Sequence, residues 1–210
     1  AERMKLWSYA LLVFIFCAFM YPMVANWVWN PNGWLALRGF NDFAGSAAVH
    51  AMGGFSALAA AIVLGPRIGK YNEDGSSNTI PGHNLPLAAV GAFILWFGWF
   101  GFNGGSALSA GNSAGMALLV THIAAATASL VWMFIEWFRF GRPSLVGIVT
   151  GMVAGLATVT PASGFIGIPG GLILGLAGGV ACYIAVDLIR VRLKIDDSLD
   201  VFAVHGVGGI

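Results

Sequence analysis

Long apolar runs alternate with short polar stretches along the whole chain. The runs cover residues 6–29, 43–64, 85–108, 114–137, 144–159 and 172–189, and a further run begins near Asp200. A transmembrane helix needs about 20 mostly apolar residues, whereas a strand of a membrane β-barrel shows about ten residues that alternate between apolar and polar. These runs do not alternate. The pattern therefore predicts an all-α, multi-pass membrane helix bundle with about six full transmembrane helices and the start of a seventh.

Basic residues gather in every second loop between these runs. Nine of the ten are Arg3, Lys5, Arg67, Lys70, Arg139, Arg142, Arg190, Arg192 and Lys194. The opposite loops, at residues 30–41, 109–113 and 161–171, contain only Arg38. Because Lys and Arg are retained on the cytoplasmic side of a membrane, we expect the N-terminus in the cytoplasm and those three loops outside, in a cell-membrane protein.

The composition removes several classes of protein. Only 9% of the 210 residues are charged and the net charge is +1. A soluble domain carries about 25% charged residues, and a nucleic-acid-binding protein carries a basic surface. The 30 glycines suit closely packed membrane helices. Cys17 and Cys182 show no metal-binding spacing, and we expect two buried apolar thiols.

Two histidines interrupt the apolar runs within the same short motif. The frame V-H-x-x-G-G occurs at residues 49–54 and again at 204–209. It contains His50 in the first copy and His205 in the second. An aspartate near the start of each helix, Asp42 or Asp200, can cap free backbone N–H groups. Ionisable groups inside a membrane are energetically unfavourable, so both histidines are candidates for function.

The two copies of the motif lie on spans that cross the membrane in opposite directions. A motif duplicated on antiparallel spans indicates an inverted repeat, whose pseudo-two-fold axis brings His50 and His205 together near the middle of the membrane. Two neutral imidazoles there can bond to each other and to a small polar solute. No carboxylate or thiolate lies nearby in sequence to complete a metal site. The alternative is two unrelated core histidines, each bonded to a neighbouring helix.

Aromatic residues crowd the end of the third run, at residues 96–106. Aromatic side chains at a membrane boundary commonly form an interfacial belt. They can instead bind a small cation, because ring faces attract cations. Ser106 would add a hydroxyl oxygen, and Trp29 ends the first run on the same outer side. The sequence pattern is compatible with both an interfacial belt and a cation site. His122 is an isolated histidine in an apolar run, and we expect it to be structural.

Five longer motifs resemble those of one transporter family. They are residues 42–50, 83–86, 98–106, 158–164 and 200–206. In this order they resemble the ammonium transporter family, in its Amt/Mep branch rather than the distant Rh branch. The resemblance implies an eleven-helix, inverted-repeat fold assembled as a homotrimer with one pore per subunit. Residues 1–210 then form one partial ammonium transporter domain, truncated at both ends, from about the fourth to the early tenth helix.

The resemblance also implies roles for residues along the pore. The twin pore histidines of the family correspond to His50 and His205, and one of its two stacked gating phenylalanines corresponds to Phe102. The family aspartate that supports the outer site without touching ammonium corresponds to Asp42. Asp200 is expected to support the second histidine-bearing helix.

The outer ammonium-recruiting site of the family corresponds to Trp29 and Ser106. Trp99 is expected to be a supporting residue. The family has a glycine run after the site tryptophan, whereas this chain has Asn-Pro-Asn-Gly at residues 30–33. Trp27 lies close enough to Trp29 to be an alternative site tryptophan.

The resemblance implies transport of ammonium or ammonia without a cofactor. Ammonium would bind as a cation at the outer site and lose its proton, and ammonia would pass the histidine pair. Three alternatives remain: an ammonium sensor on the same scaffold, a channel for methylamine or CO2, and a membrane enzyme that uses the histidines as acid and base. We expect a transporter rather than an enzyme, with the lipid bilayer around it. A PII-type regulatory protein is expected at the loop of residues 65–84, and no nucleic acid.

Overall fold

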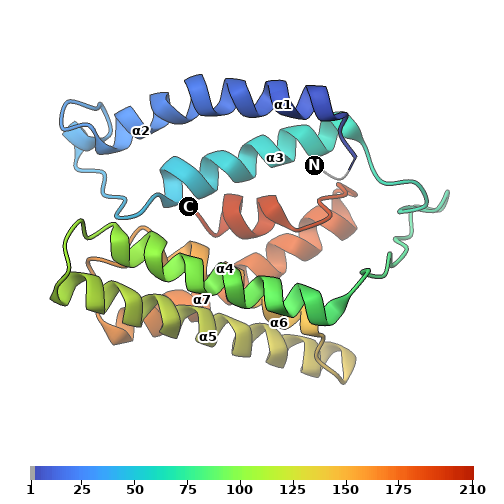
Figure 1. The fold of residues 1–210 in the computed structure, drawn as a ribbon. Coiled ribbons are helices and arrows are strands. Elements are labelled where there is room, and N and C mark those ends of the chain that lie inside the picture. The colour runs from blue at the N-terminus through green and yellow to red at the C-terminus, as the bar shows by residue number, and fades with distance from the viewer. Residues whose placement is uncertain (1–2) are drawn as a thin grey trace.

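The computed structural model describes residues 3–210 as a bundle of helices that run side by side (Figure 1). The helices are α1 (Leu6–Ile15), η1 (Phe16–Met20), α2 (Tyr21–Trp29), η2 (Ala36–Arg38), η3 (Ser46–Ala51), α3 (Met52–Leu64), α4 (Leu85–Gly105), α5 (Asn112–Phe140), α6 (Leu145–Val159), α7 (Ile168–Asp187), η4 (Leu188–Arg192) and η5 (Phe202–Val207). The η2 segment is a 3-10 turn, and the other η segments are π-helical. Residues 3–210 contain no β-strand, only an isolated bridge between Tyr71 and Ser77.

Among residues 3–210, five continuous helices are long and apolar enough to cross a membrane. They are Leu6–Trp29, Ser46–Leu64, Leu85–Gly105, Asn112–Phe140 and Ile168–Arg192. The predicted all-α membrane bundle is therefore confirmed. The predicted span at 144–159 is a helix of only 15 residues, Leu145–Val159, which is about 22 Å long and shorter than a hydrocarbon core of about 30 Å.

Helix ends follow from local sequence signals. The side chain of Asn84 accepts a hydrogen bond from the backbone N–H of Leu87 and caps α4. Ser144 caps α6 in the same way through Gly147. Gly141 ends α5 with φ of 75°, a left-handed conformation that favours glycine. Polar residues between the apolar runs thus set where the helices begin and end.

Small residues bring the central helices close together. Ala124 and Ala128 on α5 are fully buried. A methyl group at Gly155 of α6 would overlap with the carbonyl oxygen of Ala124, and one at Gly151 would lie 2.7 Å from the carbonyl oxygen of Ala128. Glycine at these positions therefore allows α6 to pack directly on the backbone of α5.

The helix α1 lies at the edge of the bundle and packs little of its surface (Figure 1). None of its residues is buried. Cys17, in the η1 segment that continues it, is exposed, whereas Cys182 on α7 is buried. The prediction of two buried thiols is therefore wrong for Cys17, because an apolar run alone does not tell which of its faces packs against protein.

The two ends of the bundle differ in chemistry. We call the end that carries Arg67, Arg139 and Arg190 the basic end, and the end that carries Trp29 and Ser106 the aromatic end. The basic end lies on the right in Figure 1, beside the start of α1 and the long loop between α3 and α4.

Segments that are far apart in sequence are tied together at the basic end. The carboxylate of Asp196 accepts hydrogen bonds of 2.8 Å from the backbone N–H, Nε and Nη2 of Arg67, and Nη1 of Arg3 lies 3.5 Å from it. These hydrogen bonds lower the pKa of Asp196 to about 2. The hydroxyl of Tyr71 donates to the carbonyl oxygen of Arg190 over 3.0 Å. The linker that leads to η5 is thus fixed from two sides.

Candidate functional site

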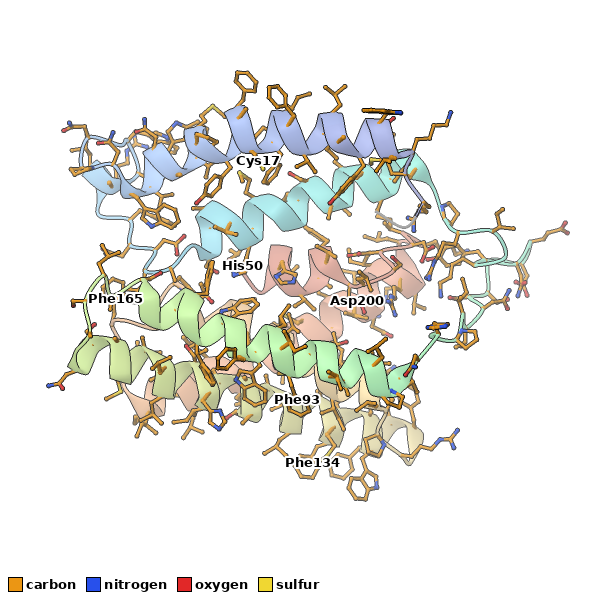
Figure 2. All side chains as sticks on the ribbon, in the orientation of Figure 1. Cys17, His50, Phe93, Phe134, Phe165 and Asp200 are labelled. Carbon is orange, nitrogen blue, oxygen red and sulfur yellow. The ribbon has the colours of Figure 1, made fainter. Side chains whose placement is uncertain are left out.

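The structure brings His50 and His205 into contact inside the bundle. Their Nδ1 atoms lie 3.2 Å apart. This is a hydrogen-bond distance when one of the two Nδ1 atoms carries a proton and the other does not. The ring centroids are 5.2 Å apart, with an angle of 28° between the rings. Figure 2 shows His50 between α3 and α4, deep within the bundle. Residues 155 positions apart therefore form one pair.

Both histidines lie in π-helical segments. His50 belongs to η3 and His205 to η5. A π-helical turn is uncommon and recurs at functional sites, because the extra residue in the turn changes where side chains point. The two segments cross with a reciprocal contact. A methyl group at Gly54 would overlap with the backbone of Gly206, and one at Gly209 would lie 3.0 Å from the nitrogen of Ala51.

Asp42 holds the start of the first histidine segment. Its two carboxylate oxygens accept hydrogen bonds from the backbone N–H groups of Gly45, Ser46, Ala47 and Ala48, at 2.7–3.2 Å. Its backbone carbonyl accepts a bond of 2.8 Å from Nε1 of Trp29. Asp42 is buried. It therefore links the orientation of Trp29 to the segment that carries His50.

Asp197, and not Asp200, performs the same task for the second histidine. Oδ2 of Asp197 accepts a hydrogen bond of 2.7 Å from the backbone N–H of Phe202, the first residue of η5. Asp200 instead faces Arg190, whose Nε lies 2.6 Å from Oδ1. The expectation that Asp200 caps the helix therefore does not hold. Asp197 and Asp42 each precede their histidine by eight residues. This equal spacing is visible in the sequence and points to Asp197 as the counterpart of Asp42.

Aromatic rings form one wall of the histidine pair. Trp99 stacks on His50 with 4.8 Å between ring centroids and 14° between ring planes, and it lies 6.3 Å from His205. The ring of Phe102 lies 5.5 Å from that of His50. Nε1 of Trp99 donates to the hydroxyl of Thr160 over 2.9 Å. The structure thus brings both Trp99 and Phe102 to the pair.

Sequence reasoning missed a buried polar chain behind this wall. The hydroxyl of Thr160 donates to Oδ1 of Asn103 over 3.3 Å, and Nδ2 of Asn103 donates to the hydroxyl of Thr121 over 2.8 Å. All three residues are fully buried. The single Asn within an aromatic, glycine-rich helix was the one local signal for it. This chain of hydrogen bonds fixes the Trp99 ring, and therefore the surface on which His50 stacks.

Trp29 and Ser106 both lie at the aromatic end but do not touch. No hydrogen bond or ring contact joins them among the described residues. The hydroxyl of Ser106 donates to the carbonyl oxygen of Phe102 over 2.8 Å. Trp27 packs on Trp34 with 5.9 Å between ring centroids. Of the two candidate tryptophans, only Trp29 is bonded to the segment that leads to His50.

A cavity extends from His205 toward the basic end. Its volume is about 410 Å³, and most of its lining is apolar. His205 lines it together with Val201 and Val204, and Arg190 and Asp200 also line it. His205 therefore faces an apolar cavity whose charged lining comes from one ion pair.

His122 lies outside this group of residues. It stacks on Trp96 with 5.1 Å between ring centroids and is exposed on α5. No group of three or more His, Cys, Asp or Glu side chains that could hold a metal ion is found among residues 3–210.

The sequence of the whole chain matches those of known proteins. The model of the Ammonium Transporter Family matches residues 1–210. The ammonium transporter Amt1 of Archaeoglobus fulgidus is 48% identical over 210 residues, which is all of this chain and 52% of that protein. The ammonium transporter MEP2 of Saccharomyces cerevisiae is 40% identical over 209 residues, which is 99% of this chain and 42% of that protein. The chain thus spans about half the length of these relatives.

Solved structures agree with the sequence matches. A structure titled Sensor Amt Protein superimposes with a TM-score of 0.90 at 44% identity, over 92% of this chain and 49% of that one. Mep2 of Candida albicans superimposes with a TM-score of 0.90 at 40% identity, over 99% of this chain and 45% of that one. The curated relatives are named as transporters and not as enzymes. From its first residue to its last, the chain belongs to the ammonium transporter family.

Proposed function

We propose that this chain forms the histidine-bearing part of a pore through which the full-length protein transports ammonium across a membrane. The contact between Nδ1 of His50 and Nδ1 of His205, at 3.2 Å, carries the proposal. It joins two segments of one duplicated motif inside an apolar bundle. Membership of the ammonium transporter family supports the choice of solute.

The histidine pair has the chemistry for a small neutral solute. When the Nδ1 atoms share one proton between them, the Nε2 atoms are left to face the pore. Nε2 of His50 is buried, and no hydrogen-bond partner for it is found among the described residues. Ammonia both donates and accepts hydrogen bonds, so it can satisfy this nitrogen as it passes. A buried polar atom without a partner is unfavourable, so a passing solute that bonds to it is stabilised.

Recruitment would take place at the aromatic end. Ring faces attract ammonium, and the Trp29 ring and the Ser106 hydroxyl lie at that end of the bundle. A charge is strongly disfavoured in an apolar bore, so the proton leaves before ammonia passes Phe102 and the histidines. Potassium has no proton to lose, and the same step excludes it.

The proposed orientation places the basic end in the cytoplasm of a cell-membrane protein. Exposed apolar side chains support insertion in a bilayer: Phe93 and Phe134 are 65% and 47% exposed, and Phe134 points away from the bundle in Figure 2. A homotrimer and the remaining helices of the full-length protein would cover part of this surface. The basic end would then offer the loop of residues 65–84 to a PII-type regulatory protein.

A sensor is the second candidate function. The similarity to the structure titled Sensor Amt Protein, at 44% identity, favours it. Growth on ammonium of a cell that lacks its own ammonium transporters distinguishes the two, because a sensor without transport does not restore growth. A channel for methylamine or CO2 would be revealed by competition with ammonium uptake.

The decisive test replaces both pore histidines in the full-length protein. We expect His50→Leu with His205→Leu to abolish ammonium uptake while potassium stays excluded, because the bore then offers passing ammonia no hydrogen-bonding group. Uptake is measured with the protein in liposomes. His122→Leu is the matched control, since His122 lies outside the pair, and it should behave as the unsubstituted protein. Unchanged ammonium uptake and selectivity in the double variant would show that the histidine pair does not act in transport.

A further inference from the structure

The acidic residues near the histidine segments differ in how fully their carboxylates are bonded. Asp42 accepts four backbone N–H groups, and Asp196 accepts three hydrogen bonds from Arg67. Asp200 is different. Its one ion-pair partner among residues 3–210 is Arg190, with Nε at 2.6 Å from Oδ1, and that contact lacks hydrogen-bond geometry. Since a carboxylate accepts about four hydrogen bonds, Asp200 keeps unused acceptor capacity.

This carboxylate is buried and faces the cavity that His205 lines. Asp200 is 6% exposed. It lines the cavity of about 410 Å³ that His205 also lines, and the lining between them includes Val201 and Val204. In Figure 2, Asp200 lies closer to the basic end than His50. A solute that leaves the histidines in this direction therefore crosses an apolar surface and then meets Asp200.

The backbone holds Asp200 in an unusual conformation. Its φ is 54°, one of three positive φ angles at non-glycine residues in the described chain. Aspartate and asparagine adopt this left-handed region more readily than most residues. An asparagine can therefore replace Asp200 with the same backbone, the same size and no charge.

We propose that the Asp200 carboxylate binds ammonium at the basic end of the pore, with Arg190 limiting the strength of binding. The proposal rests on the proposed function. Ammonia from the bore takes a proton from hydronium: its lone pair forms the new N–H bond, and water is released. The resulting ammonium has four N–H donors, which match the acceptor capacity of a buried carboxylate. The Arg190 guanidinium competes with ammonium for the negative charge of Asp200, so the bound ammonium can dissociate.

The test compares ammonium on the two faces of the membrane. The full-length protein is reconstituted in vesicles of both orientations, and the half-saturating concentration of ammonium chloride is measured from each face. For Asp200→Asn we expect a rise of about tenfold or more at the basic face, because a charge-assisted hydrogen bond is lost, and no change at the aromatic face. Asp187→Asn is the matched control, an exposed carboxylate at the same end, and should have no effect.

A second variant separates binding from a purely structural ion pair. Arg190→Gln removes the competing cation, so we expect a lower half-saturating concentration at the basic face, opposite in sign to Asp200→Asn. If the ion pair only stabilises the fold, both variants impair transport in the same direction, which overturns the site. If Asp200→Asn does not fold, Arg190→Gln tests the site by itself. An unchanged or raised half-saturating concentration at the basic face for Arg190→Gln then overturns the Asp200 site.

The outcome also distinguishes this site from the proposed function. An unsubstituted protein without ammonium flux would overturn both. Normal flux in the unsubstituted protein, together with an Asp200→Asn value equal to that of Asp187→Asn at the basic face, would overturn the ammonium site and leave transport intact.

Discussion

At the scale of single residues, the two nitrogens of each imidazole have different surroundings. The Nδ1 atoms of His50 and His205 face each other at 3.2 Å, whereas Nε2 of His50 has no partner among the described residues. Trp99 fixes the plane of the His50 ring by stacking on it with an angle of 14°. The pair is therefore preorganised by neighbours that are themselves held, Trp99 by Thr160 and the backbone of η3 by Asp42.

The Asp42 side chain gives a prediction at this scale. Asp42→Ala leaves four backbone N–H groups without their acceptor, and each buried donor without a partner costs about 1–3 kcal/mol. We expect the melting temperature of the full-length protein in detergent to fall by several degrees, with a smaller fall for Asp42→Asn, which keeps one acceptor oxygen. Asn41→Ala, an exposed neighbour, is the control. Equal melting temperatures for Asp42→Ala and Asn41→Ala would contradict this.

Sequence reasoning reached some of these residues and not others. His50, His205 and Asp42 stand out because a repeated motif and membrane burial are visible in the one-dimensional pattern. The expectation that Asp200 caps the second histidine segment was wrong, because nearness to the predicted helix start does not tell how the linker turns. In the structure Asp200 has a left-handed backbone and faces Arg190.

Contacts between helices that are distant in sequence could not be predicted from the sequence either. Thr160 and Asn103 are 57 positions apart, and their hydrogen bond exists only after α4 and α6 have packed. Each residue taken alone is an ordinary small polar residue in an apolar helix. Helix positions, in contrast, followed from the length of the apolar runs and from caps such as Asn84 and Ser144.

At the scale of elements, the crossing of two histidine segments sets the distance between the imidazoles. Both segments are π-helical, a feature that apolar periodicity did not reveal. The crossing is reciprocal, because Gly54 packs on the backbone of Gly206 and Gly209 packs on that of Ala51. In each contact the residue four positions after one histidine meets the residue directly after the other. The two copies of the V-H-x-x-G-G motif thus contact each other reciprocally, which is the packing expected for an inverted repeat.

The Gly54 contact predicts an effect of one added methyl group. Gly54→Ala forces α3 and η5 apart, since the new methyl would overlap with Gly206, and overpacking costs about 1–3 kcal/mol. We expect ammonium uptake to fall by about tenfold or more, because the imidazoles lose their alignment. Gly53→Ala is the matched control, as a methyl there meets nothing within 4 Å. If both variants transport ammonium equally, the crossing does not set the histidine geometry.

At the scale of the whole molecule, the Asp196 carboxylate connects three parts of the chain. It bonds to Arg67 in the loop after α3 and lies 3.5 Å from Arg3 before α1, although these residues are 129 and 193 positions away. Asp196 itself belongs to the linker that leads to η5. The loop after α3 and the start of the chain are therefore both bonded to the linker that leads to the segment carrying His205.

The pH dependence of stability follows from this connection. The pKa of Asp196 is lowered to about 2, first by the hydrogen bonds from Arg67, and the usual value for aspartate is about 3.9. A carboxyl group with a lowered pKa in the folded protein stabilises it above the unfolded pKa, by about 2 kcal/mol here, and this contribution is lost as the pH falls from about 4 toward 2. We therefore expect Asp196→Asn to lower the melting temperature of the full-length protein at pH 7, with a difference from the unsubstituted protein that shrinks as the pH approaches 3. Glu73→Gln, at an exposed position in the loop after α3 that also carries Arg67, should show no such difference. A deficit of Asp196→Asn that stays constant from pH 7 to pH 3 would mean that its charge does not hold the three segments together.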